Sequence, residues 1–378
     1  MHPTTAATAT ADALITEQAT KHQRLVALLE ERGADSLLLT SAGALSWYLG
    51  GARVHVSLAG GPIAAVLVHR GGAELGLFTN EAARLRAEEL GGSEGVTVHE
   101  VPWHGNLHDV AAWYPEASAW SILGEEEVAA GLRAARASLL PAELQRYRTL
   151  CRDAAAALTD VLTAATGEMT ERQVAAELAR AVVTFGADPV VVLVSGDSRA
   201  QHRHPLPTDA PLGRRAMAVV CARKYGLIAN VTRWVTFGEL LDGEEELDRR
   251  ILEVEAEILG QLRPGAAMDE LLPVIQEAYP RHGFAEDEWT KHHQGGAAGY
   301  NGRDPRLAPG VADTLVTGQA FAWNPTAADP LTGLVAKVED TILLTEREGA
   351  PVLEVLSVDE RWPSVEVAGR QRPAVLRR

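Results

Sequence analysis

The sequence predicts a two-domain protein in which an α/β domain is followed by an α+β domain. In the first part of the chain, short apolar strand patterns alternate with helical patterns. In the second part, a run of strands is followed by two amphipathic helices and then by more strands. With 378 residues, the chain is also longer than one ordinary hydrophobic core requires. We place the first domain at residues 1–138, with residues 1–15 as a loose tail, and the second domain at residues 139–378.

In the first domain, helices and strands are expected to alternate. Residues 17–33 carry apolar residues at helical spacing and end at Gly33, a residue that suits a helix terminus. Residues 36–40 (SLLLT) have the apolar composition of a buried strand. Further strands are expected at 62–69, 73–79, 96–103 and 119–124, and a further helix at 80–90. A linker near residues 135–142 contains Pro141 and is expected to separate the domains.

A long helix at residues 141–166 is expected to open the second domain. The next helix begins at Thr170, because Gln173 three residues later completes a capping-box pattern that satisfies free backbone N–H groups. Strands then precede and follow two amphipathic helices. The helices are expected at 243–262 and 268–282, and the strands at 189–196, 216–226, 227–238, 320–325, 334–345 and 352–356.

Composition excludes several classes of partner. The hydrophobic content of 46% and the charged content of 23% are typical of a globular protein in water, and no signal peptide or membrane-spanning run is evident. A net charge of −16 argues against binding to nucleic acid or to an anionic membrane. Cys151 and Cys221 lack metal-site spacing and are too few for a disulfide framework. These features favour a cytoplasmic protein whose partner is a small-molecule substrate.

Polar residues that suit a binding site concentrate in three stretches of the second domain. The stretch WTKHHQGGAAGYNGRD (289–304) contains two adjacent histidines and a glycine pair, and glycine lets a backbone approach a ligand closely. HPLPTD (204–209) adds a third histidine, with NVTRW (230–234) behind it. The strand containing KVEDT (337–341) has an acidic residue at the edge of an apolar run, where an unpaired buried charge is costly.

These motifs, in this order, resemble those of the pita-bread fold shared by methionine aminopeptidase, Xaa-Pro aminopeptidase, prolidase and creatinase. HPLPTD resembles the family's His-x-x-Pro-Thr-Asp, and NVTRW resembles its Asp-x-Thr-Arg-Thr strand. HHQGGAAGYNGRDP, WNP and KVEDT resemble its histidine–glycine, Glu-Pro and Glu-Asp-Thr segments. The first domain resembles the α/β domain of the prolidase–creatinase branch, with WYLGG (47–51) at a turn typical of it. The resemblance covers nearly all of the chain and implies a pita-bread second domain.

The sequence departs from the resembled family at the metal ligands. Peptidases of this fold hold two metal ions with two aspartates, one histidine and two glutamates. The corresponding residues here are Val219 or Cys221, then Asn230, Gly296, Asn324 and Glu339. Two divalent ions need several anionic oxygens, which one carboxylate with neutral amides does not supply. We therefore expect no metal and no other cofactor, and a site that keeps its polar character without its charge.

Three histidines are candidates for acid/base chemistry, since imidazole titrates nearest to neutral pH. By resemblance, His204 and His292 correspond to histidines that contact substrate, and we assign both as catalytic. His293 is a neighbour of His292, and in an extended strand the two would point to opposite faces, so that one enters the cavity. We assign His293 to substrate binding. A structural histidine in a loop or in the core is the alternative for each.

Glu339, the third catalytic candidate, is expected to be a free carboxylate in a partly apolar site. It would hold an ammonium or guanidinium group, or act as a base if burial raises its pKa. An ion pair with Arg233 or Lys337 is the alternative. Asn230 and Asn324 are candidates to orient a carbonyl or amidino group by hydrogen bonds, although an inert site would look the same.

Arginine residues are candidates to bind a substrate carboxylate through a bidentate fork. Arg53 follows the WYLGG turn, in the region from which creatinase-like dimers reach the partner's active site, so the resemblance implies a homodimer. Arg233 and Arg303 are further candidates, and Arg303 stands where the peptidases have their second histidine. A surface salt bridge is the alternative for each arginine. Tyr300 completes the residues assigned to substrate binding.

Three functions are compatible with these residues. The favoured one is metal-independent hydrolysis of a C–N bond, of the creatinase and ectoine hydrolase type, in a small amino-acid-like zwitterion, and C–N elimination suits the same cavity. The second is a metal-dependent Xaa-Pro dipeptidase or aminopeptidase, with metal held by His204, His292, His293 and Glu339. The third is a catalytically inactive binding protein related to the peptidases.

Overall fold

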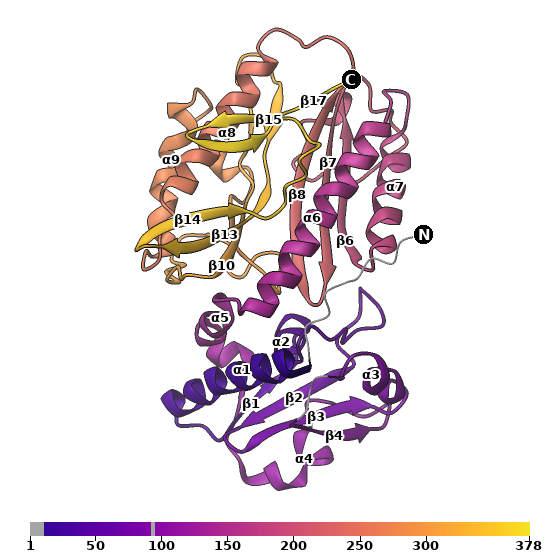
Figure 1. The fold of residues 1–378 in the computed structure, drawn as a ribbon, viewed down its shortest axis with the longest axis vertical. Coiled ribbons are helices and arrows are strands. Elements are labelled where there is room, and N and C mark those ends of the chain that lie inside the picture. The colour runs from indigo at the N-terminus through magenta and orange to yellow at the C-terminus, as the bar shows by residue number, and fades with distance from the viewer. Residues whose placement is uncertain (1–10, 92–94) are drawn as a thin grey trace. The chain divides into compact units, whose positions relative to one another are not determined.

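The computed structural model describes residues 11–91 and 95–378, which fold as two compact units (Figure 1). Among the described residues, the first unit comprises residues 11–91, 95–136 and 140–146, and the second comprises residues 137–139 and 147–378. Residues 1–10 of the expected loose tail lie outside the described residues. The rest of that tail was assigned wrongly, because the first helix begins at Ala11.

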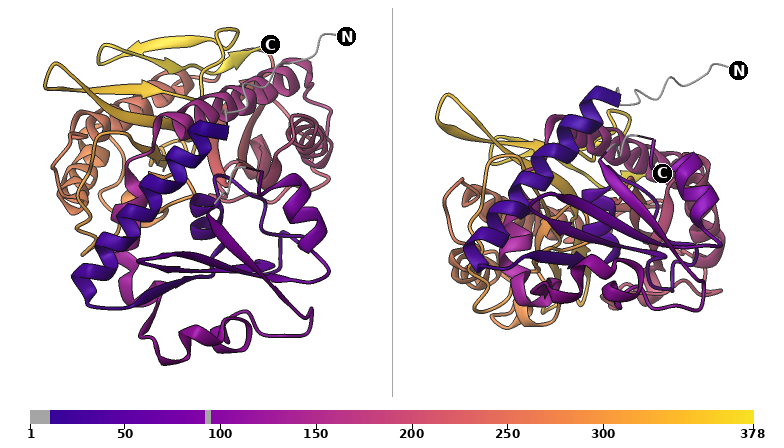
Figure 2. Two further views of the ribbon diagram at one scale, coloured as in Figure 1. Left: turned by 60° about the horizontal axis from the view of Figure 1, so that its bottom comes forward. Right: turned by 90° about the horizontal axis from the view of Figure 1, so that it is seen from below.

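The first unit is an α/β layer structure, as expected. Its helices and strands are α1 (Ala11–Arg32), β1 (Ser36–Leu39), α2 (Ala42–Tyr48), β2 (Ala64–His69), β3 (Gly72–Phe78), α3 (Ala82–Glu88), β4 (Val96–Val101), α4 (Val110–Trp113), β5 (Ile122–Gly124) and α5 (Ala129–Ala137). Within the described residues, the strands form one mixed sheet in the order β4-β3-β2-β1-β5. Helices α1 and α4 lie on opposite faces of this sheet (Figure 2).

The second unit has the order strands, helices, strands that the sequence predicts. Its helices are α6 (Pro141–Ala164), α7 (Glu171–Thr184), α8 (Glu244–Gly260) and α9 (Leu271–Arg281). Its strands are β6 (Asp188–Gly196), β7 (Arg215–Lys224), β8 (Leu227–Thr236), β9 (Gly295–Ala298), β10 (Gln319–Trp323), β11 (Thr326–Ala328), β12 (Val335–Lys337), β13 (Asp340–Arg347), β14 (Ala350–Val355), β15 (Ser364–Val367), β16 (Arg370–Pro373) and β17 (Leu376–Arg377).

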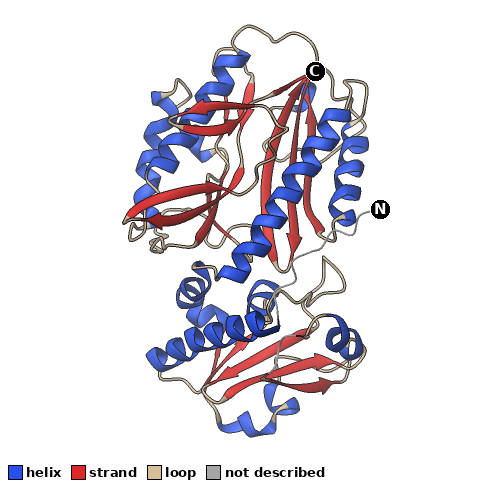
Figure 3. Ribbon diagram, in the orientation of Figure 1, coloured by secondary structure: helices blue, strands red, loops and turns tan. Residues whose placement is uncertain are grey.

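Two four-stranded sheets of the described residues frame the second unit, in the orders β17-β8-β7-β6 and β14-β13-β10-β9. Helices α6 and α7 lie beside the first sheet, and α8 and α9 lie beside the second (Figure 3). The second sheet and its helices share a core that includes Ile258, Ile275, Phe321 and Ile342. The sheets meet where the backbone N–H of Thr232 donates to the carbonyl of Glu339 at 3.0 Å.

Two local predictions can be compared directly with the structure. The capping box at the start of α7 is confirmed, because Thr170 Oγ1 accepts from the Gln173 N–H and the Gln173 side chain accepts from the Thr170 N–H. The single strand expected at 334–345 is instead divided into β12 and β13, which pair with different partners. The division falls at Val338 and Glu339, which places the Glu339 carboxylate at the junction between the sheets.

A membrane-spanning helix is absent from the described residues, since none combines the length and the apolar character that crossing a bilayer requires.

Candidate functional site

Three histidines gather in the second unit. His204 lies in the loop between β6 and β7, whereas His292 and His293 precede β9. His204 Nε2 lies 3.1 Å from His292 Nε2, and one ring nitrogen from each of the three residues lies within 4.8 Å of the others. The expectation that His292 and His293 point to opposite faces is wrong, because their rings stack at 4.4 Å. That expectation assumed an extended strand at His292 and His293, but the strand β9 begins only at Gly295.

All three imidazoles are held in their neutral form near pH 7. Burial, followed by the positive charge of Lys337, lowers the pKa of His292 to about 2. Burial and the charge of Arg303 lower the pKa of His293 to about 3. His204 is more exposed, and desolvation and Lys337 lower its pKa also. The cluster therefore offers nitrogen lone pairs, and His204 is its solvent-facing member.

The carboxylate of Glu339 is engaged by protein groups on both oxygens. Oε1 accepts from Arg303 Nη2 at 2.7 Å, and Oε2 accepts from the Thr232 hydroxyl at 2.8 Å and lies 3.6 Å from Lys337 Nζ. Burial raises the pKa of Glu339, but Lys337 and Arg303 outweigh burial and bring it to about 2. The expected free carboxylate is therefore wrong. Of the two ion-pair partners expected for Glu339, Lys337 contributes, but the hydrogen-bonded partner is Arg303.

Asn230 lies beside this ion pair. Its Oδ1 accepts from Arg303 Nη1 at 3.0 Å and from the Cys221 thiol at 3.3 Å. Burial raises the pKa of Cys221 to about 12, so the thiol keeps its proton and acts as this donor. Between Val219 and Cys221, Cys221 is the residue that faces Asn230, because β7 and β8 pair in that register. Val219 packs with Trp234 in an apolar cluster.

Arg233 does not join the site, which corrects its assignment to substrate binding. It follows Thr232 on β8, and its guanidinium donates to Asp340 Oδ1 and to the Ser357 carbonyl, both at 2.8 Å. Arg372 donates to the other oxygen of Asp340 at 2.8 Å. Because successive side chains of a strand point to opposite faces, Thr232 reaches Glu339 and Arg233 is committed to this separate buried network.

The other candidate residues, Asn324, Tyr300 and Arg53, lie in three different environments. Asn324 is buried at the end of β10, and its Oδ1 has no hydrogen-bond partner among the described residues. Tyr300 is buried in the turn after β9. Arg53 belongs to the first unit, where its exposed guanidinium pairs with Glu89 at 2.5 Å. This pair is the surface salt bridge that was the alternative for Arg53.

Lys337 belongs to the site, although the sequence predicts it only as an alternative ion-pair partner of Glu339. Its side chain is buried, and its charge lowers the pKa of both His204 and His292. A usable signal was present in the sequence, because Lys337 and Glu339 are two residues apart and side chains at this spacing share one face of a strand. The exposed Arg306 adds positive charge near His204 and His293.

The glycine pair serves protein packing, which corrects the expectation that it makes room for a ligand. A Cβ atom at Gly295 would lie 2.4 Å from the Ala322 carbonyl oxygen, and one at Gly296 would lie 2.3 Å from the Pro305 carbonyl oxygen. The φ angles of 126° and 149° also favour glycine. The backbone at Gly296 therefore has no room for the histidine that the resembled peptidases use as a metal ligand.

The residues of the site do not fit a pair of divalent metal ions. Glu339 is neutralised by Arg303 and Lys337, and the Asn230 oxygen is occupied by Arg303. The three histidines supply neutral nitrogens, but a metal ion there would lie near the cationic groups of Lys337 and Arg303. This donor set lacks the several anionic oxygens that two such ions need.

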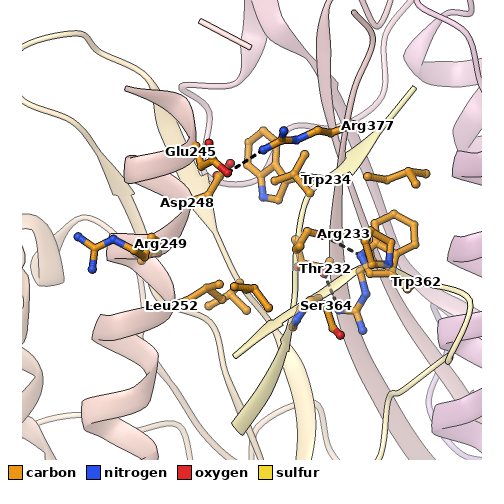
Figure 4. Close-up of a pocket in the computed structure, with 18 of the residues that line it drawn as sticks. Thr232, Arg233, Trp234, Glu245, Asp248, Arg249, Leu252, Trp362, Ser364 and Arg377 are labelled. Atoms are coloured by element: carbon orange, nitrogen blue, oxygen red, sulfur yellow. Dashed lines mark hydrogen bonds and ion pairs between the residues drawn. The ribbon is translucent and has the colours of Figure 1, made fainter. Parts of the chain in front are cut away.

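A cavity of about 840 Å³ lies in the same unit, between β8 and α8 (Figure 4). Trp234 and Trp362 lie on one side of it, whereas Arg249 and Leu252 lie on the α8 side. Thr232 and Lys337 line it, and both also contact Glu339. Neither the three histidines nor the Glu339–Arg303 ion pair is among its lining residues, so this cavity lies beside the site.

Comparison with known proteins identifies a family. The model of metallopeptidase family M24 matches residues 145–346, which is more than half of the chain. No curated protein matches the sequence.

Solved structures match over nearly the whole chain. A prolidase from Pyrococcus horikoshii OT3 superposes with a TM-score of 0.72 at 19% identity, covering 90% of this chain and 99% of its own. A Xaa-Pro dipeptidase from Bacillus anthracis gives a TM-score of 0.70 at 18% identity, covering 95% and 99%. The N-terminal domain of FACT complex subunit SPT16 from Cicer arietinum (chickpea) gives 0.66 at 12% identity, covering 92% and 96%. The predicted α/β plus pita-bread architecture is therefore confirmed.

Proposed function

This chain belongs to metallopeptidase family M24, and from that premise we propose that it hydrolyses a C–N bond in a small amino-acid-like zwitterion without a metal ion. The observation that carries this proposal is the 3.1 Å contact between His204 Nε2 and His292 Nε2. One imidazole of the pair is exposed and the other is buried, so protons can pass between solvent and the interior of the site.

The chemistry assigned to the pair is general acid/base catalysis of water attack. A neutral imidazole takes a proton from water as the water oxygen forms a bond to the carbonyl or amidino carbon. The C–N bond breaks as the leaving nitrogen receives a proton, and the products are an acid or amide and an amine. Water supplies both the oxygen and the proton, and no electrons are exchanged with the protein. In C–N elimination, an imidazole instead takes a proton from the carbon next to the one that bears the nitrogen, a C=C bond forms as the C–N bond breaks, and the leaving nitrogen receives a proton.

The substrate class follows from the remaining polar groups. The guanidinium of Arg303 and the ammonium of Lys337 favour a ligand that carries negative charge near them. The buried Oδ1 of Asn324, which lacks a partner among the described residues, is an acceptor for an ammonium or amidino N–H. A zwitterion with an amide, amidine or guanidino group has both features.

Substrate screening by ligand-induced thermal stabilisation, followed by turnover assays, tests this proposal. We expect His204→Ala to lower turnover by about 10²-fold to 10⁴-fold, the range of a lost general acid or base. His202→Ala, a change in the same loop, is the matched control and should retain activity. Incorporation of ¹⁸O from labelled water separates hydrolysis from elimination. Inhibition of wild-type turnover by EDTA would contradict the metal-independent mechanism.

A metal-dependent peptidase is the second candidate, and one observation favours it. Ring nitrogens of His204, His292 and His293 lie within 4.8 Å of one another, a spacing that one zinc ion can bridge. The stacked rings of His292 and His293 disfavour it, because near-parallel rings do not direct their lone pairs to one point. Hydrolysis of proline dipeptides that depends on added Zn²⁺, Mn²⁺ or Co²⁺ would establish this candidate.

A non-catalytic binding protein is the third candidate. The similar structure from chickpea is described as a domain of a complex subunit and not as a peptidase, so the fold alone does not decide between catalysis and binding. This candidate predicts that His204→Ala leaves the biological role intact. A homodimer in the cytoplasm is also part of our proposal, and light scattering at working concentration tests the dimer.

A further inference from the structure

The centre of the second unit carries more buried positive charge than the Glu339 carboxylate balances. Arg303 and Lys337 both lie against Glu339, at 2.7 Å and 3.6 Å, and the side chains of all three are at most 8% exposed. Two cations beside one anion leave one positive charge in excess. Such a charge is costly in a buried site unless a further anion approaches it.

Arg303 and Lys337 also have N–H groups available to donate hydrogen bonds to a ligand. The ammonium of Lys337 has three N–H groups, yet Glu339 Oε2 at 3.6 Å is too distant to accept a hydrogen bond from its Nζ. Arg303 donates through Nη1 and Nη2, but its buried Nε has no partner in the described part of the chain. A buried donor without an acceptor, such as Arg303 Nε, is uncommon, and it marks a place where a ligand oxygen completes the hydrogen bonding.

We propose that Arg303 and Lys337 form an oxyanion-binding site, held in place by Glu339 and Asn230, that receives the carboxylate of the substrate. Glu339 acts as a positioning residue, since Oε1 fixes Arg303 and Oε2 lies near Lys337. Asn230 fixes the other arm of Arg303 at 3.0 Å. Protein cations thus supply the positive charge that metal ions supply in the resembled peptidases. Lys337 is also one of the residues that line the cavity beside β8.

This inference rests on the proposed function only for the statement that the anion belongs to a substrate. Binding of an oxyanion is tested without turnover, by titrating acetate and, separately, inorganic phosphate into the full-length protein in a calorimeter at constant ionic strength. We expect acetate to bind the wild type with one site per chain. Tighter binding of phosphate than of acetate would overturn the assignment of a carboxylate ligand.

Two substitutions give opposite expectations. Lys337→Gln removes one cation, and we expect acetate affinity to fall at least tenfold. Glu339→Gln removes the internal competitor for the two cations, and we expect acetate affinity to rise at least tenfold. If Lys337→Gln folds poorly, Glu339→Gln still tests the proposal. If the Glu339 carboxylate had only a structural role, its removal would not strengthen anion binding.

The matched control is Lys291→Gln, which alters an exposed lysine that pairs with Asp287 and Glu288 next to His292. Its acetate affinity should equal that of the wild type. Equal affinity of acetate for all four proteins, or weaker binding by Glu339→Gln, would overturn the proposal. If His204→Ala binds acetate but shows no turnover, the anion site is supported and the lost function is catalysis.

Discussion

The Nε2 atoms of His204 and His292 lie 3.1 Å apart, and the first ring is exposed whereas the second is buried. One proton fits between two nitrogens at this separation, so one ring donates and the other accepts. The two rings therefore adopt complementary tautomers. The surroundings of the two rings also give them different pKa values, since burial and Lys337 bring the pKa of His292 to about 2.

Imidazole titration by NMR provides the first test of this pair. We expect His292 to remain neutral from pH 8 down to pH 4.5, because its pKa of about 2 lies far below this range. His204 should titrate, with a pKa below that of a free imidazole. The measurement is the ¹⁵N shift of each ring, assigned with His204→Gln and His292→Gln. Protonation of His292 near pH 6.5 would contradict the buried, cation-flanked site.

The free energy of unfolding should depend on pH through the same histidines. Unfolded histidines protonate near pH 6.5, whereas His292 and His293 have folded pKa values of about 2 and 3. Below pH 6.5, the unfolded chain therefore binds more protons than the folded chain. Stability is full above pH 6.5 and falls with decreasing pH, by up to about 1.4 kcal/mol per pH unit for each histidine.

Urea unfolding between pH 4.5 and 7 measures this slope before the Glu339 carboxylate contributes. The Glu339 pKa of about 2 lies below its unfolded value, so its stabilisation is lost only as the pH falls below about 4.5. We expect the double variant His292→Gln/His293→Gln to show a flatter dependence between pH 4.5 and 6.5. The same slope in both proteins would show that these imidazoles protonate normally in the folded state.

Much of the architecture was predictable because it depends on local patterns. The Thr170–Gln173 capping box fixed the start of α7, and apolar periodicity located α6, α8 and α9. The hairpin of β15 and β16 was missed, because each strand has four residues and most of these residues are not buried, which leaves no long apolar pattern. The start of α1 was placed late because the first turns carry small residues without a clear apolar stripe.

The site was only partly predictable, because its electrostatics depend on contacts between distant segments. The sequence identified His204, His292 and Glu339 as neighbours by resemblance. It did not show that Arg303 reaches Glu339, since this pairing joins residues 36 positions apart, one in the loop after β9 and the other between β12 and β13. The roles of Gly295 and Gly296 were also hidden, because they depend on the carbonyls of Ala322 and Pro305.

Metal content provides a prediction that separates the two enzymatic candidates. We expect the purified protein to contain far less than one equivalent of any divalent metal by elemental mass spectrometry. EDTA should leave the melting temperature unchanged, because the cations near Glu339 are Arg303 and Lys337. Stoichiometric zinc, with a melting temperature that EDTA lowers, would instead support a metal ion held by the three histidines.

Arg233 should be essential for stability and dispensable for ligand binding. Its guanidinium neutralises the buried Asp340, so Arg233→Gln leaves that carboxylate with Arg372 as its ion-pair partner and the Ser357 hydroxyl as a neutral donor. We expect a loss of about 3–5 kcal/mol in the free energy of unfolding, as for other broken buried ion pairs. Acetate affinity of the folded fraction should be unchanged, and a tenfold loss of affinity would return Arg233 to the binding site.

Substitution of Gly296 tests whether the lost histidine ligand can be restored. We expect Gly296→His to lose on the order of 3 kcal/mol in stability and to gain no metal affinity, because a Cβ there meets the Pro305 carbonyl oxygen at 2.3 Å. Gly302→Ala is the matched control, since a Cβ at Gly302 meets nothing within 4 Å. Urea unfolding with and without Zn²⁺ measures both effects. A stable Gly296→His protein that binds zinc tightly would show that the backbone between β9 and Pro305 adapts, and that the charge of Arg303 and Lys337 does not exclude a metal ion.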